Sequence, residues 1–109
     1  MNWSGFFMEI YNLVSKDSDI PQWNESMGKV RKSTNLCSVL LYCYRLYYNK
    51  QKDLQWWRTF LRELLDFTKK SAGKDKSEIK KMSKENAKNY QDDDINKIYF
   101  YLVLEMVGK

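Results

Sequence analysis

The chain contains no histidine. This absence removes the commonest general base, the Ser-His and Cys-His nucleophile pairs and most zinc ligand sets. The sequence also lacks a glycine-rich phosphate loop and a dinucleotide-binding fingerprint. Asp92, Asp93 and Asp94 form an acidic run, but consecutive residues at a helix start do not converge on an ion, and capping explains them. We therefore expect a protein that is not an enzyme, with no cofactor and no metal site.

Cysteine is scarce as well. Cys37 and Cys43 are the two cysteines, and on a helix their side chains point about 120° apart, at about 100° per residue. They cannot bridge one another, and their apolar neighbours suit small core residues. The expected setting is reduced and intracellular, in the cytoplasm.

Long hydrophobic runs are missing too. The longest, Leu36–Tyr48, is shorter than the roughly 20 residues that span a bilayer, and it contains Arg45. The first residues lack the positive charges of a signal peptide, and Glu9 and Asn12 interrupt the apolar stretch that follows. We expect no signal peptide and no membrane partner.

One proline and four glycines leave long uninterrupted segments among the 109 residues. Apolar residues recur at helical spacing, and no segment alternates convincingly between apolar and polar residues. The pattern predicts an all-α fold, an antiparallel bundle of four to five helices, in a single domain of residues 1–109.

The expected helices have recognisable starts and stripes. Asp53, Asp75 and Asp92 precede apolar stripes and fit N-cap positions, and Gly73 fits a helix end. Two further helices are expected at Trp3–Val14 and Pro21–Lys32, the second of which can run on into Leu36–Tyr48. Leu36–Tyr48 is apolar almost all round, which is typical of a helix that is central in its domain or buried in an interface. On one side of it we place Leu36, Val39, Leu40, Cys43, Tyr44 and Tyr47. On its other sides we place Leu41, Tyr42, Leu46 and Tyr48.

Basic residues gather in one stretch, residues 69–88. It holds eight of the nineteen basic residues and only three acids, so the whole formal charge of +5 lies there. Such a localised charge is typical of a protein that binds an anionic partner, most often a nucleic-acid backbone. The eight residues are Lys69, Lys70, Lys74, Lys76, Lys80, Lys81, Lys84 and Lys88.

Four of these lysines share one side of a predicted helix. On a helical wheel, Lys80, Lys81, Lys84 and Lys88 fall within roughly 100° of one another. The opposite side carries an apolar seam of Ile79, Met82, Asn86 and Tyr90, too thin for adsorption to a membrane. The lysines can therefore engage the phosphates of single-stranded DNA or RNA, although a merely solvated lysine-rich face is the alternative.

Aromatic residues make up 16% of the chain, and some of them are candidates for contacts with nucleic-acid bases or with other proteins. Arg58 and Arg62, beside Trp56, could stack on bases, or pair with neighbouring acids instead. The many aromatic residues of Leu36–Tyr48 cannot all enter one small core. We expect a protein–protein interface at Leu41, Tyr42, Tyr48 and Trp56.

In size, basic charge and helical pattern the chain resembles the small helical subunit of CRISPR effector complexes. The stretches that carry the resemblance are Val30–Tyr48 (VRKSTNLCSVLLYCYRLYY), the lysine-rich helix and Ile95–Val107. The resemblance implies several copies packed side by side, lining the path of a nucleic acid with basic residues in antiviral defence.

Two main hypotheses follow. The first is a non-catalytic subunit of a nucleoprotein complex, with other subunits or copies of itself as partners. The alternative is a protein-interaction adaptor, or a viral inhibitor that binds an acidic protein surface. A sequence-specific DNA reader is less well supported, because the second element of the best helix–turn–helix candidate, Lys29–Asp53, is apolar and not a polar reading helix.

Overall fold

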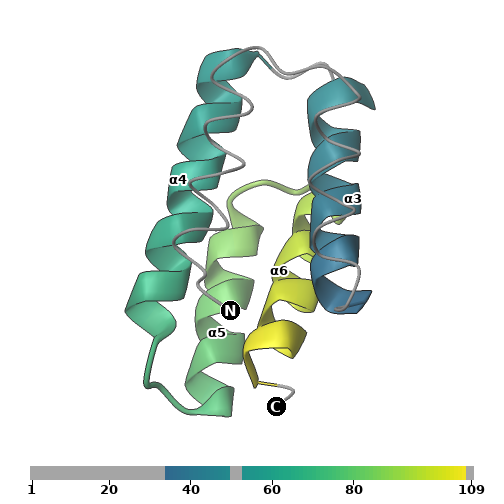
Figure 1. The fold of residues 1–109 in the computed structure, drawn as a ribbon. Helices are drawn as coiled ribbons and strands as arrows, with labels where there is room; N and C mark the ends of the chain where they lie inside the picture. Colours follow the sequence, from purple (N-terminus) through teal and green to yellow (C-terminus); the bar gives the residue numbers. More distant parts are fainter. Residues whose placement is uncertain (1–33, 50–52, 108–109) are drawn as a thin grey trace.

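The computed structural model describes residues 34–49 and 53–107, apart from the side chains of Tyr48, Asn49 and Leu54. Within these residues the fold is all-α, as predicted, and contains no strand. The chain runs along α3, back along α4, forward along α5 and back along α6, in an antiparallel bundle (Figure 1). The expected helices Trp3–Val14 and Pro21–Lys32 lie outside the described residues. The helices are α3, Thr34–Asn49; α4, Leu54–Ser71; α5, Lys76–Lys88; and α6, Asp93–Val107.

Aspartates cap three of the helices. Asp53 and Asp75 each accept a hydrogen bond from the backbone N–H three residues further on, at 2.7 and 2.9 Å. Asp92 Oδ1 accepts one from the N–H of Asp94 at 2.8 Å, at the start of α6. These bonds satisfy N–H groups that a helix leaves open at its first turn, so the three predicted N-caps are confirmed.

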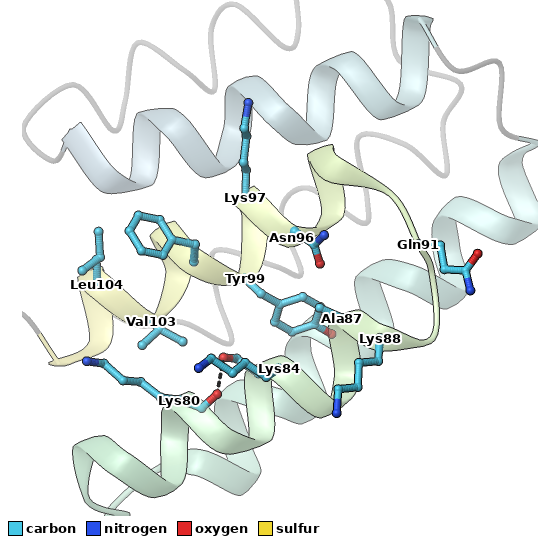
Figure 2. A pocket seen from close by; sticks show the side chains of 12 residues that line it. Lys80, Lys84, Ala87, Lys88, Gln91, Asn96, Lys97, Tyr99, Val103 and Leu104 are labelled. Atoms are coloured by element: carbon cyan, nitrogen blue, oxygen red, sulfur yellow. Dashed lines mark hydrogen bonds between the residues drawn. The ribbon is translucent and has the colours of Figure 1, made fainter.

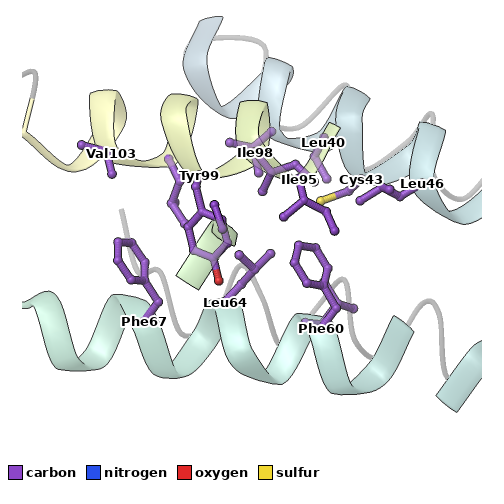
Figure 3. Close-up of a cluster of buried hydrophobic side chains, with 14 of the residues drawn as sticks. Leu40, Cys43, Leu46, Phe60, Leu64, Phe67, Ile95, Ile98, Tyr99 and Val103 are labelled. Atoms are coloured by element: carbon purple, nitrogen blue, oxygen red, sulfur yellow. The ribbon is translucent and has the colours of Figure 1, made fainter. Parts of the chain in front are cut away.

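The core lies between α4 on one side and α3 with α6 on the other (Figure 3). Trp57, Phe60 and Phe67 of α4 are fully buried, and Phe67 meets Tyr99 edge to face at 5.3 Å between ring centroids. Such large side chains make the core of a small domain. The buried apolar residues are Leu36, Val39, Leu40, Cys43, Leu46, Trp57, Phe60, Leu61, Leu64, Phe67, Ile79, Ala87, Ile95, Ile98, Tyr99, Leu102 and Val103.

One assignment on α3 was wrong. Leu46, which was placed on a different side of the helix from Val39, is fully buried together with it, whereas Tyr44 and Tyr47 are half-buried. Leu46 follows Val39 by two helical turns and therefore lies on the same side of the helix. The tyrosines lie at the rim of the core, which is the usual place for an apolar ring with a polar hydroxyl.

A carboxylate links α4 to the C-terminal half of the bundle. Tyr99 of α6 donates a hydrogen bond to Glu63 Oε1 at 2.6 Å, and Tyr90, just after α5, donates to Glu63 Oε2. Burial raises the pKa of both tyrosines, and the hydrogen bond to Glu63 and its negative charge raise it further. Both hydroxyls therefore remain protonated donors, and this contact, the Glu63 brace, helps to fix how α5 and α6 sit on α4.

Candidate nucleic-acid interface

The lysines of α5 lie on its solvent side. Ile79, Ser83 and Ala87 are buried and face the bundle, and Met82 and Asn86 are half-buried beside them. Ser83 and Ala87 have small side chains, so α5 can lie close to the rest of the bundle on this buried side. The predicted lysine stripe of Lys80, Lys81, Lys84 and Lys88 is exposed along its whole length.

Three of these lysines border a groove between α5 and α6, which we call the α5–α6 groove (Figure 2). Its volume is about 930 Å³. Lys80, Lys84 and Lys88 project from α5 one turn apart, whereas Lys97 projects from α6 towards α3. The described residues that line the groove include four lysines and no carboxylate: Lys80, Ser83, Lys84, Ala87, Lys88, Gln91, Asn96, Lys97, Tyr99, Phe100, Val103 and Leu104.

Besides Asn96 and Lys97, the α6 side of the groove carries apolar and aromatic residues. Tyr99 and Val103 are buried, and Tyr99 is held by the Glu63 brace and by Phe67. Phe100, in contrast, is 58% exposed, the larger value of the two exposed large hydrophobic side chains among the described residues. Phe100 and Lys97 were not among the predicted site residues, although both fall outside the apolar stripe of α6, which is a signal that they face away from the core.

The remaining basic residues do not join this groove. Lys69 and Lys70 are exposed in the last turn of α4, and Lys74 lies in the turn that follows, where its Nζ is 3.7 Å from Glu78 Oε2. Lys76 is exposed at the start of α5, and Lys81 is exposed without lining the groove. The predicted cluster is therefore spread over more than one face of the bundle.

Arg62 and Lys70 line a second, smaller hollow of about 450 Å³ between α4 and α5. Glu63, Asp66 and Glu85 line it too, so its positive and negative charges are mixed. Arg58 is half-buried on α4. This balance of charge gives the hollow a weaker positive potential than that of the α5–α6 groove, whose described lining has no carboxylate.

The residues predicted to form a protein interface have different surroundings. Leu41 is 42% exposed on α3. Tyr42 is half-buried and stacks on Tyr101 at 5.9 Å between centroids, with Lys97 Nζ at 5.2 Å and Arg45 Cζ at 5.3 Å from the centre of its ring.

Trp56 is half-buried and packs within the same chain, stacked on Phe60 at 5.4 Å and edge-on to Tyr90 at 6.1 Å. The Tyr48 side chain lies outside the described residues. Of the four predicted interface residues, Leu41 therefore presents the most accessible apolar surface among those described.

The cysteines and acids of the described residues are the side chains to consider as disulfide partners and metal ligands. Neither Cys37 nor Cys43 takes part in a disulfide, and burial raises the pKa of Cys43 far above its ordinary value. Within the same residues, no group of three or more His, Cys, Asp or Glu side chains could hold a metal ion. None of the described helices is both long and apolar enough to cross a bilayer.

Comparisons of the chain with protein-family models, with curated proteins and with solved structures gave no match. The site consists of a row of lysines along one side of a groove whose other side carries an exposed phenylalanine.

Proposed function

We propose that this chain is a non-catalytic, cytoplasmic small subunit of a nucleoprotein assembly that binds nucleic acid through the α5–α6 groove. The observation that carries the proposal is the charge of the groove, whose described lining holds four lysines and no carboxylate. Because the described lining contains no carboxylate, these lysines attract an anionic chain over a distance of about 10 Å at 0.1 M salt.

The spacing of the lysines suits a polymer. Lys80, Lys84 and Lys88 follow each other at intervals of four residues, so neighbouring side chains lie about 6 Å apart at their base. That interval is comparable with the spacing of successive phosphates in an extended strand. A small isolated anion uses one or two cations, whereas this row gives each of several phosphates its own contact.

Other surfaces would hold neighbouring subunits. Leu41 on α3 lies away from the groove lining, so a protein contact there leaves the lysines accessible. The resemblance to the small subunit of CRISPR complexes supports the same arrangement, in which aromatic and apolar faces hold adjacent copies and basic residues line the path of the nucleic acid.

Nucleic-acid titration tests this proposal. Binding of a fluorescent 20-nucleotide single strand is measured by anisotropy at two salt concentrations, with wild type and the variant Lys84→Ala/Lys88→Ala. We expect weaker binding by the variant for every sequence used, and a log–log salt slope flattened by roughly 1.4, because each phosphate contact contributes about −0.7.

The control is Lys69→Ala/Lys70→Ala, which removes the same charge from the end of α4, outside the groove. If the two double variants lose nucleic-acid affinity equally, the nucleic acid is attracted to the basic protein as a whole. That result would contradict a binding site in the groove. Negligible affinity of the wild type for any nucleic acid, together with binding to an acidic protein, would favour the adaptor alternative.

A further inference from the structure

Phe100 is an apolar side chain without an evident structural role. It is 58% exposed on α6, next to buried Tyr99 and half-buried Tyr101. A ring left in solvent contributes little to the core, since hydrophobic stabilisation follows the apolar area removed from water. Its edge-to-face contact with Tyr101, at 5.3 Å between centroids, restricts how the ring can move.

The ring lines the same groove as the α5 lysines. An aromatic surface beside a row of cations is the combination that binds single-stranded nucleic acid, in which bases stack on rings while the backbone follows the positive charge. The same face suits a second copy of this chain poorly, because four lysines would then meet four lysines.

We propose that the α5–α6 groove is a site for single-stranded nucleic acid, in which Phe100 stacks on a base while Lys80, Lys84 and Lys88 contact the adjoining phosphates. This inference rests on the proposed function and adds that the groove distinguishes single strands from duplexes. In a duplex the bases are already stacked on one another, so their faces are not open to the ring. Base stacking needs no base-specific hydrogen bond, and the site should therefore tolerate any sequence.

The test compares wild type with single variants at Phe100 and Leu41 and with Lys84→Ala/Lys88→Ala, using two probes. The probes are a fluorescent oligothymidine strand and a blunt duplex of the same length, measured at several salt concentrations. Phe100→Ala should weaken binding of the single strand by roughly 5- to 150-fold. The log–log salt slope of binding by Phe100→Ala should equal that of wild type, since stacking releases no counterions. Phe100→Trp should restore or exceed wild-type affinity, because it keeps an aromatic face.

Leu41→Ala is the matched control, since it removes the other exposed large hydrophobic side chain of the described residues, on a different helix. On a strand short enough to hold a single copy, where self-association through Leu41 does not enter, this variant should keep wild-type affinity for both probes. Far-ultraviolet circular dichroism of each variant shows whether it is folded. If Phe100→Ala is not folded, the affinity of Phe100→Trp still tests the role of an aromatic ring at this position.

The outcomes separate the two proposals. If Phe100→Ala binds the single strand as wild type does while Lys84→Ala/Lys88→Ala flattens the salt slope, the lysine site stands and the stacking role is wrong. Equal affinity of wild type for strand and duplex also overturns the stacking role, as does an equal loss in Leu41→Ala. If no probe binds wild type, the proposed function fails and this inference fails with it.

Discussion

Two single residues show how the backbone closes its turns. Gly73, after α4, has φ +79°, and Gln91, between α5 and α6, has φ 52°. Both lie in the left-handed region, which glycine adopts without strain and residues with a Cβ avoid. The sequence analysis placed the helix end near Gly73, but the left-handed turn at Gln91 had no glycine to indicate it.

These two positions lead to predictions of opposite sign. Gly73→Ala should lower the free energy of unfolding by about 1 kcal/mol, through backbone strain alone. A Cβ at this position would meet nothing within 4 Å, so no clash adds to the loss. Gln91→Gly should raise stability by about 0.5–1 kcal/mol, because it removes the strain. Urea unfolding of both variants checks the pair, and the same sign of change in both would show that the turns are not as described.

The Glu63 brace predicts a dependence on pH. Tyr99→Phe should destabilise the protein by about 1.5–3 kcal/mol at pH 7, because a hydrogen bond to a charged group is lost. The pKa of Tyr99 in the fold lies above the unfolded value of about 10. The stability that this hydroxyl contributes is therefore present below pH 10 and is lost as the pH rises beyond it.

Denaturation of wild type and Tyr99→Phe across pH 6 to 11 measures this effect. The difference in unfolding free energy between the two proteins should be constant up to about pH 9 and should shrink above about pH 10. Taking the difference removes the contribution of the many lysines, which titrate in the same range. A difference that grew above pH 10 would contradict the direction of the pKa shift.

At the scale of elements, α3 presents Leu41, an apolar side chain 42% exposed, on a helix whose opposite side is in the core. We predict that the chain self-associates through this face. Leu41→Lys should raise the dissociation constant of the complex at least roughly tenfold, since burying a leucine side chain contributes about 1.5–3 kcal/mol.

Analytical ultracentrifugation over a range of protein concentrations measures this association. Lys81→Ala is a suitable comparison, because Lys81 is an exposed residue on another helix. Identical concentration dependence for wild type and Leu41→Lys would rule out the α3 face, and a wild-type chain that stays monomeric at high concentration would end the prediction of self-association.

The local features of the fold could be read from the sequence because they depend on neighbouring residues. The caps at Asp53, Asp75 and Asp92 follow from short side chains before apolar stripes, and the separation of lysines from Ile79 on α5 follows from helical period. The error at Leu46 came from a helix with apolar residues on nearly every side, where periodicity alone does not identify the buried face.

The groove could not be predicted in the same way, because it depends on which helices pack together. Nothing near Lys97 or Phe100 in the sequence indicates that α6 lies beside α5 with these residues along the same groove as Lys84. The charge count made residues 69–88 one cluster, whereas the bundle places Lys70 in a different hollow. Contacts between residues far apart in sequence, such as the Glu63 brace, decide that arrangement.

For the whole molecule, the central claim is that a groove with one sign of charge binds a nucleic-acid backbone. The most direct measurement is the salt dependence of single-strand binding by wild type and by Lys80→Ala/Lys84→Ala/Lys88→Ala. The account predicts that the triple variant binds all sequences more weakly, with its log–log slope flattened by about 2, and that its unfolding free energy hardly changes, since exposed charges contribute little to stability. A folded triple variant with wild-type affinity and an unchanged salt slope would contradict it.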